Sequence, residues 1–431
     1  MSDRADPRER NVVAVLEERG LIAQLTESGL PEAAADRQLY VYCGFDPTAP
    51  SLHVGNLVPV MVLAHFQRHG HRPILLVGGG TGMIGDPSGK SVERPLLTPE
   101  QVVEHSARIR DQLAGYLTFE GPAAATMVNN ADWLGKMSLI EYLRDIGKHF
   151  SVNTMLAKES VKTRMAGEQG ISYTEFSYMI LQATDFLHLF DAFGCTVQVG
   201  GTDQWGNLLA GVELIRRTRE ARVHALTVPL ITTSSGAKFG KSEGNAFWLD
   251  PAMTTPYEMY QYWINSDDRD VGHFLKVFTF LPLEEIAALE REQAAHPERR
   301  EAQRMLAFEI TKLIHGEATA RAVAAASNVL FGAGVEELTE EGLPHLAGAV
   351  PTTVIPAAAL AGGLPLLETL VAAGVQPSKG AARRLIQQGG LYVNDRRITD
   401  SEQMLTAGEA LFGRAVLLRS GKNKYHLLLA K

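Results

Sequence analysis

Two lysines stand three residues apart in a stretch rich in serine and glycine. They are Lys238 and Lys241 of the run Lys-Phe-Gly-Lys-Ser, which ends at Ser242. Ammonium groups at this spacing can close over phosphate oxygens, because the surrounding glycine and serine leave the backbone mobile. By itself such a loop is more often a solvated surface turn. It indicates phosphate binding only together with a second pattern elsewhere in the chain.

A second phosphate-binding pattern lies far upstream, between Tyr42 and Asn56. Tyr-Cys-Gly-Phe-Asp-Pro-Thr closes one apolar stretch, and Ser-Leu-His-Val-Gly-Asn opens the next. We expect a strand to end here, the chain to turn, and a helix to begin at the following apolar run. The N-terminus of a helix attracts phosphate because its first N–H groups have no partner within the helix.

These two patterns resemble the signature motifs of class I aminoacyl-tRNA synthetases, at His53 to Asn56 and at Lys238 to Ser242. The first departs from the family pattern in ending on Asn56 rather than histidine. With Gly-Asp-Pro-Ser-Gly-Lys ending at Lys90 and Gly-Gly-Thr-Asp-Gln-Trp-Gly-Asn ending at Asn207, the chain is similar to bacterial tyrosyl-tRNA synthetases over nearly its whole length. The resemblance implies tyrosine-tRNA ligase activity: tyrosine and ATP give tyrosyl-adenylate and pyrophosphate, and tyrosine then passes to the 3′-terminal ribose of tRNA(Tyr).

Activation of an amino acid depends on positioning and on cations that stabilise the departing pyrophosphate. The resemblance implies that the catalytic residues are Thr48, His53, Lys90, Arg94, Lys238 and Lys241. It implies that ATP is bound by Cys43, Gly44, Asp46, His53, Asn56, Gly201, Asp203, Gln204, Lys241 and Ser242. Taken singly, His53 could be a structural residue at a helix start and Asp203 an N-cap. We expect Mg²⁺ to arrive with ATP, with no protein metal site and no tightly bound cofactor.

A tyrosine site must provide partners for a phenol hydroxyl that leaves water. Tyr178, Gln182 and Asp185 recur at spacings of four and three, so they share one face of a predicted helix. The resemblance assigns the phenol to Tyr42 and Asp185. It assigns the substrate ammonium to Tyr178, Gln182 and Asp86, and adds Gln198 to the amino-acid site.

Three other functions stay open. The spacing G-x-G-x-x-G from Gly80 to Gly85 allows a dehydrogenase, but Pro87 and Gly89 follow where that fingerprint needs a continuing helix. A phosphate loop ending at Lys90 would need glycine at Ile84. A tryptophanyl enzyme and a non-enzymatic RNA-binding protein that kept the fold are the remaining alternatives.

The composition is that of a protein with two or three domains: 431 residues, of which 45% are hydrophobic. The N-terminus is charged, and no uninterrupted apolar run is long enough to span a bilayer. Two cysteines, Cys43 and Cys195, are too few for a disulfide framework. These features predict a cytoplasmic protein without a membrane partner.

Alternating apolar strands and amphipathic helices predict an α/β fold with a parallel sheet. We expect a Rossmann-like catalytic domain at 1–245, interrupted by a helical insertion at about 127–193. An α-helical domain should follow at 246–335, and a proline- and glycine-rich linker at 336–362. The order of elements in the remainder, 363–431, resembles a small helix-and-hairpin RNA-binding module of a ribosomal protein, so we expect a small α+β RNA-binding domain there.

This last segment holds ten Lys and Arg against five Asp and Glu, a balance of +5, although the whole chain carries −8. Such asymmetry favours phosphate contacts with RNA over a merely solvated face. The candidate tRNA-binding residues are Arg383, Arg384, Arg396, Arg397, Lys422 and Lys424. The resemblance also implies a homodimer, with the helical insertion as its interface.

Overall fold

The computed structural model describes residues 11–26, 29–89, 95–167, 170–234, 236, 241–242 and 245–431, without the side chains of 241, 242 and 245. The chain divides into two compact units. One consists of Met1–Thr254 and Asp267–Ala302, the other of Thr255–Ser266 and Gln303–Lys431. The predicted helical domain, 246–335, is therefore shared between the two units.

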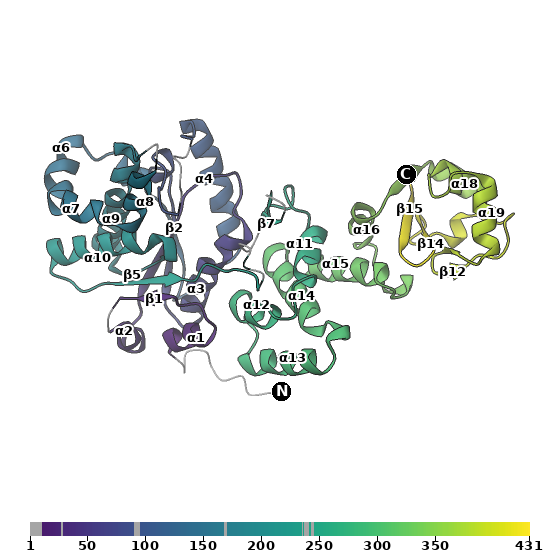
Figure 1. Cartoon of the computed structure of the whole chain (residues 1–431), viewed down its shortest axis with the longest axis horizontal. Helices are drawn as coiled ribbons and strands as arrows, with labels where there is room; N and C mark the ends of the chain where they lie inside the picture. Colours follow the sequence, from purple (N-terminus) through teal and green to yellow (C-terminus); the bar gives the residue numbers. More distant parts are fainter. Residues whose placement is uncertain are drawn as a thin grey trace. The chain divides into compact units, whose positions relative to one another are not determined.

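A six-stranded sheet forms the centre of the first unit, in the order β1-β6-β5-β2-β3-β4 (Figure 1). Its strands are β1 (Gln24–Leu25), β2 (Tyr40–Phe45), β3 (Arg72–Val77), β4 (Thr126–Asn129), β5 (Cys195–Gly201) and β6 (His224–Val228). Strands β2 to β6 are parallel, as predicted, and β1 pairs antiparallel with β6. The strand order changes direction between β2 and β5. In such sheets ligands bind beside the carboxyl ends of the strands at this point.

Helices cover both faces of this sheet (Figure 1). Helices α3 (Leu57–Arg68) and α4 (Pro99–Leu113) lie on one side, and α9 (Tyr173–Phe193) and α10 (Trp205–Arg219) lie on the other. Helix α9 begins at Ser172, whose hydroxyl caps the N–H of Glu175, and it ends at Gly194 with φ of 70°. Its buried side chains include Met179 and Phe186, which join the apolar cluster with α10.

The insertion predicted at 127–193 is corrected at its start. Residues 126–129 form β4, which pairs parallel with β3. Four residues are too few for hydrophobic periodicity to separate a strand from a helix. The rest of the insertion is helical, as predicted, and contains α5 (Ala131–Leu134), α6 (Leu139–Glu141), α7 (Val152–Leu156), α8 (Glu159–Ala166) and α9.

The next segment contains helices only, as predicted: α11 (Pro256–Ile264), α12 (Val271–Phe278), α13 (Leu283–Ala295), α14 (Glu301–His315) and α15 (Glu317–Leu330). Arg19 joins α12 and the segment after it to the N-terminal part of the first unit. Its guanidinium donates hydrogen bonds to the carbonyls of Lys276, Thr279 and Leu281 at 2.6–3.0 Å. None of the helices in the described part of the chain combines the length and apolar character needed to span a membrane.

The second unit ends in a five-stranded sheet of order β12-β11-β14-β15-β9. Its strands are β9 (Thr352–Ile355), β11 (Leu391–Val393), β12 (Arg396–Arg397), β14 (Ala415–Ser420) and β15 (Lys424–Ala430). Helices α18 (Leu366–Ala372) and α19 (Lys379–Gln387) pack on it, and Ser378 caps α19 as predicted. We call residues 352–431 the C-terminal module.

The prediction that residues 336–362 form a linker without packed elements is wrong. This segment contains α16 (Leu343–Ala349), β9 and α17 (Ala357–Gly362), and β9 pairs parallel with β15. The prolines that suggested an irregular connection bound these elements instead. Pro344 lies in the first turn of α16, Pro351 precedes β9, and Pro356 is the N-cap of α17.

Candidate active site

Asp46, just after β2, connects the carboxyl ends of the central strands to α9. Its Oδ1 accepts a hydrogen bond from the Thr81 hydroxyl and its Oδ2 accepts one from the Tyr178 hydroxyl, both at 2.7 Å. A Cβ atom at Gly78 would lie 2.0 Å from Asp46 Oδ1, so only glycine lets the loop after β3 approach this closely. Sequence reasoning placed Asp46 near the nucleotide, and its carboxylate contacts Tyr178 of the predicted amino-acid site.

Asp185 is a buried carboxylate on the same face of α9. Its Oδ1 accepts a hydrogen bond from Trp133 Nε1 at 2.8 Å, and its Oδ2 accepts one from Asn130 Nδ2 at 2.9 Å. Burial raises the pKa of Asp185 to about 8, opposed by these two hydrogen bonds and assisted by the charge of Asp46. Burial therefore disfavours the anionic form of this carboxyl, while its two hydrogen bonds favour it.

Tyr42 and Gln198 carry buried polar atoms that face the same region. Each side chain is 1% exposed, and among the described residues neither Tyr42 Oη nor Gln198 Oε1 has a hydrogen-bond partner. Burial, and next the charge of Asp185, raise the pKa of the Tyr42 phenol. Because nearly all buried polar atoms are paired, the unpaired Tyr42 hydroxyl beside the Asp185 carboxyl marks a place for a polar ligand.

Asp86 anchors a second polar cluster, which joins the loop after β3 to α9 and α10. Its Oδ2 accepts a hydrogen bond from Gln204 Nε2 at 2.5 Å, and its Oδ1 accepts one from the N–H of Ser88 at 2.9 Å. Asn207 Nδ2 lies 3.2 Å from Gln182 Oε1 and 3.4 Å from Asp86 Oδ1. The structure thus brings together three predicted site residues, Asp86, Gln182 and Gln204.

Sequence reasoning missed the side chains that hold these carboxyl groups: Thr81, Asn130, Trp133 and Asn207. Asn130 and Trp133 lie 55 and 52 positions from Asp185 in the sequence, and local residue spacing does not predict contacts over such separations. Trp133 is further fixed by stacking on His188, with ring centroids 4.2 Å apart. Asn207 did stand in a recognised motif, the last residue of Gly-Gly-Thr-Asp-Gln-Trp-Gly-Asn.

The histidine signature forms a short 3-10 turn, η2 (Val54–Asn56), that leads into α3. His53 Nδ1 accepts a hydrogen bond from the N–H of Gly55, so the neutral ring carries its proton on Nε2 and can donate from there. Asn56 Oδ1 accepts from the N–H of His53 at 3.0 Å. Asn56 therefore completes the cap of this turn.

The segment that follows the lysine motif lies beside the histidine turn. The backbones of Lys241–Ser242 and Asn245–Ala246 pair as strands β7 and β8. The next residue, Phe247, accepts a hydrogen bond from the N–H of Val54 at 3.0 Å, and His53 bridges to Trp248. The chain that follows the lysine loop is thus fixed to the histidine turn.

The remaining predicted site residues lie around the carboxyl ends of β2 and β5. Thr48 is exposed, and its N–H donates to the carbonyl of Asp46 at 2.8 Å. Asp203 lies on the turn after β5, where a Cβ at Gly89 would be 3.3 Å from its Oδ2. Cys43 is buried in β2, which raises the pKa of its thiol to about 12, and Gly44 beside it is exposed. Gly201 ends β5.

Some predicted site residues lie outside the described part of the chain. They are Lys90, Arg94 and Lys238, together with the side chains of Lys241 and Ser242.

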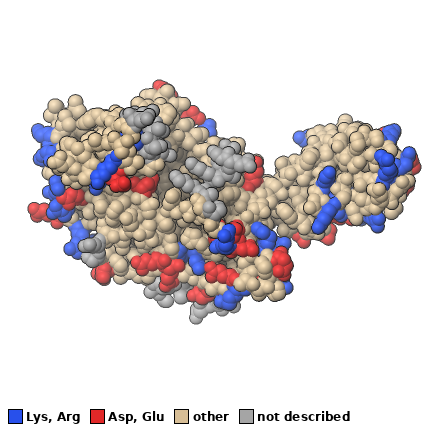
Figure 2. All heavy atoms as spheres, viewed as in Figure 1, with Lys and Arg blue, Asp and Glu red and all other residues tan. Residues whose placement is uncertain are grey.

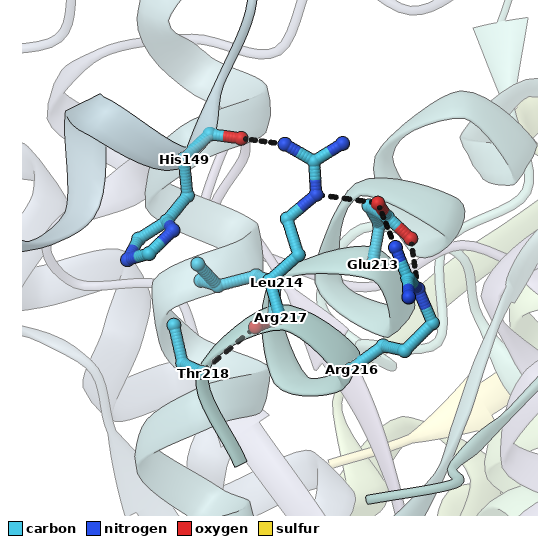
Figure 3. Close-up of polar contacts among 6 residues, drawn as sticks. All are labelled: His149, Glu213, Leu214, Arg216, Arg217 and Thr218. Atoms are coloured by element: carbon cyan, nitrogen blue, oxygen red, sulfur yellow. Dashed lines mark hydrogen bonds and ion pairs between the residues drawn. The ribbon is translucent and has the colours of Figure 1, made fainter. Parts of the chain in front are cut away.

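Helix α10, which carries Asn207, is tied at its far end to the insertion (Figure 3). Glu213 accepts hydrogen bonds from both Arg216 and Arg217, and Arg217 Nη1 donates to the carbonyl of His149 at 2.9 Å. The hydrogen bonds from Arg216 and then Arg217 lower the pKa of Glu213 to about 2. Of these contacts, only the hydrogen bond from Arg217 joins α10 to another segment of the chain.

The six predicted RNA-binding cations of the C-terminal module are all exposed: Arg383, Arg384, Arg396, Arg397, Lys422 and Lys424. On the face seen in Figure 2, this module carries several separate groups of Lys and Arg atoms and fewer Asp and Glu atoms. Arg383 pairs with Glu402 at 3.1 Å. Across the described residues, no group of three or more His, Cys, Asp and Glu could hold a metal ion.

Two family models match the chain. The model for tRNA synthetases class I (W and Y) matches residues 34–332, and the model for the tyrosine–tRNA ligase SYY-like C-terminal domain matches residues 345–428. A tyrosine–tRNA ligase of Bacillus caldotenax is 52% identical over 97% of this chain and 99% of its own length. One of Streptomyces griseus is also 52% identical, over 96% and 97%.

Solved structures agree with the sequence matches. A C-terminally truncated mitochondrial tyrosyl-tRNA synthetase of Aspergillus nidulans is 36% identical, with a TM-score of 0.69 over 75% of this chain and 94% of its own. A tryptophanyl-tRNA synthetase of Encephalitozoon cuniculi, at 14% identity and a TM-score of 0.55 over 79% and 94%, shares the fold.

Proposed function

This chain belongs to the class I tRNA synthetases of the W and Y family and, within it, to the tyrosine–tRNA ligases; from that premise we propose how its residues carry out the reaction. Tyrosine and ATP react to give tyrosyl-adenylate and pyrophosphate, and the tyrosyl group then passes to the 3′-terminal ribose of tRNA(Tyr). The observation that carries the proposal is the buried Tyr42 hydroxyl, without a described partner, next to the Asp185 carboxyl.

Tyr42 and Asp185 select tyrosine by pairing with its phenol hydroxyl. A carboxylate oxygen of Asp185 accepts a hydrogen bond from the phenol O–H, and the Tyr42 hydroxyl donates a hydrogen bond to the phenol oxygen. Phenylalanine leaves both groups unpaired in a desolvated site, and the indole of tryptophan offers a donor but no acceptor for Tyr42. On the same face of α9, Tyr178 and Gln182 bind the substrate ammonium together with Asp86. Gln198 Oε1, also buried, completes the amino-acid site.

The nucleotide lies along the carboxyl ends of β2 and β5. Thr48 and the Nε2–H of His53 meet the terminal phosphate, and Asp203 takes the ribose hydroxyls. Cys43, Gly44, Asp46, Asn56, Gly201 and Gln204 line the ATP site, and Ser242 joins them from the lysine loop. The catalytic cations are Lys90, Arg94, Lys238 and Lys241. They hold the departing pyrophosphate. Mg²⁺ arrives with the phosphates of ATP.

A homodimer is part of the proposal, with the insertion as its interface. Leu139 and Ile140 on α6, Val152 on α7 and Tyr173 at the start of α9 are 58–71% exposed. Apolar side chains gathered on neighbouring elements mark interaction sites. Sedimentation equilibrium should give twice the chain mass, and a monomer at micromolar concentration would contradict this.

The cysteines are consistent with a cytoplasmic location. Cys43 and Cys195 are buried free thiols, as is usual in a reducing compartment.

Aminoacylation tests the proposal directly. The chain is incubated with ATP, Mg²⁺, bacterial tRNA and either labelled tyrosine or labelled tryptophan. We expect labelled tRNA with tyrosine alone. Charging with tryptophan would overturn the assignment of the amino-acid site. Charging with neither, by folded protein that still binds tRNA, would favour the non-enzymatic RNA-binding alternative.

A further inference from the structure

Residues 333–344 lie between the two matched family regions, and an apolar cluster crosses this boundary. It combines Val329 of α15 and Leu346 of α16 with Leu417 and Leu427 of the C-terminal sheet, each at most 1% exposed. All belong to the second unit. The C-terminal module therefore packs against α15 and α16 through a buried core.

The turn between β11 and β12 presents Asp395 at this boundary. Asn394 and Asp395 have φ of 46° and 61°, as a two-residue hairpin turn of type I′ requires. Asn394 fixes the turn inside the module, because its Oδ1 accepts from the N–H of Leu417 and its Nδ2 donates to the carbonyl of Glu409. Asp395 Oδ2 reaches outside the module and accepts the N–H of Val335 at 2.9 Å.

Two further side chains reinforce this contact. The Arg419 guanidinium lies 3.8 Å above the Tyr392 ring, and its Nε is 3.7 Å from Asp395 Oδ1. The Tyr425 hydroxyl donates to the carbonyl of Val329 at 3.3 Å. We call Asp395, Arg419 and Tyr425, with their partners Val335 and Val329, the junction.

We infer that Asp395 is a positioning residue for tRNA charging: through its hydrogen bond to Val335 it fixes the orientation of the C-terminal module against the segment that follows α15, and so sets where the module's exposed cations meet RNA. The inference rests on the proposed function. A module with a fixed orientation presents its cations already aligned, whereas one that can shift on its apolar contact must be ordered on each encounter with RNA, which costs affinity. Adenylation does not involve the junction and should not depend on it.

The hairpin offers a selective variant. Asp395→Gly leaves an Asn-Gly turn, which is the most favourable sequence for type I′, so the module should fold while the carboxylate is lost. Asp395→Asn keeps a side-chain oxygen for the N–H of Val335. Glu340→Gln is the matched control, because it removes an exposed ion pair to Arg414 in the same region. Three quantities are measured in the full-length chain: the hydrogen exchange rate of the Val335 amide, pyrophosphate exchange with tyrosine, and kcat and KM for tRNA.

Asp395→Gly should raise both the exchange rate of Val335 and the KM for tRNA about tenfold, with pyrophosphate exchange and the kcat of charging unchanged. Asp395→Asn should recover most of the KM, and Glu340→Gln should match the parent chain. Unchanged Val335 exchange in Asp395→Gly, or faster exchange with an unchanged KM, would overturn the inference. If the parent chain charges no tRNA, the proposed function fails, while Val335 exchange still decides whether Asp395 makes the junction.

Discussion

The amino-acid site and the C-terminal module place their functional groups in opposite environments. Tyr42 and Asp185 are at most 2% exposed, whereas the six cations proposed for RNA binding are all exposed. A small substrate is selected by buried groups that lose their partners when the wrong molecule enters. A phosphate backbone is bound by solvated charges whose contributions accumulate. Substitutions should therefore act abruptly in the first site and gradually in the second.

Asp185→Asn should have the largest effect on activity. The amide has one acceptor oxygen where Trp133, Asn130 and the phenol need an acceptor, so a buried donor loses its partner. We expect the tyrosine-to-phenylalanine ratio of kcat/KM for activation to fall about 100-fold. Asp191→Asn, an exposed carboxylate on the same helix, is the control. An unchanged ratio in Asp185→Asn would remove Asp185 from the selection of substrate.

A buried ion pair between α8 and the first turn of α9 tests whether burial also governs how much an ion pair contributes to stability. Arg164 and Glu175 are 1% and 2% exposed, with Nη1 and Oε1 2.7 Å apart. Glu175→Gln leaves a buried guanidinium without a countercharge, and should lower the free energy of unfolding in urea by about 3 kcal/mol. Glu104→Gln, which breaks the exposed pair to Arg108, should cost about 0.5 kcal/mol or less. Equal losses would mean that burial does not govern these pairs.

The exposed cations should respond gradually. The slope of log affinity for tRNA against log salt is negative. Replacing Arg396 and Arg397 by glutamine should reduce its magnitude by about two, one for each phosphate contact. Tyrosine activation should not change. Arg321→Gln removes an exposed cation from α15, outside the module, and should leave the slope as it was. A slope that is the same in the double variant would show that these arginines do not contact phosphate.

The pH dependence of stability has opposite signs for two carboxyl groups of the first unit. The pKa of Glu213 is lowered from 4.5 to about 2, so its contribution is present above pH 4.5 and is lost as pH falls towards 2. Glu213 is 40% exposed, so this amounts to about 1 kcal/mol or less. The pKa of Asp185 is raised from 3.8 to about 8, so stability falls as pH rises between those values.

Urea unfolding from pH 3 to 9 measures both dependences. Glu213→Gln should flatten the acid limb of the stability profile, and Asp185→Asn should flatten the limb between pH 4 and 8. Asp191→Asn again serves as the control. Profiles parallel to that of the parent chain would contradict these assignments.

Local patterns in the sequence predicted the parallel sheet, and they placed Tyr178, Gln182 and Asp185 on one face of α9. In the structure each of these three side chains contacts a different element around the site: Asp46 after β2, Asn207 on α10, and Asn130 with Trp133 after β4. Helical spacing fixes which side chains share a face. It does not determine which other segments of the chain pack against that face.

The failures share one physical cause, which is pairing between distant segments. Residues 336–362 have the composition of a linker, yet β9 gains its hydrogen bonds from β15 near the end of the chain. Trp133 and Asn130 reach Asp185 only after the insertion folds back on the sheet. Composition and periodicity describe a segment by itself, so contacts of this kind stay hidden until the fold is known.

Exchange of pyrophosphate into ATP, measured with each of the twenty amino acids, tests the central claim most directly, because it isolates adenylation from every contact with tRNA. The arrangement of Tyr42 and Asp185 predicts exchange with tyrosine alone. Exchange with another amino acid, or none with any amino acid in well-folded protein, would contradict it.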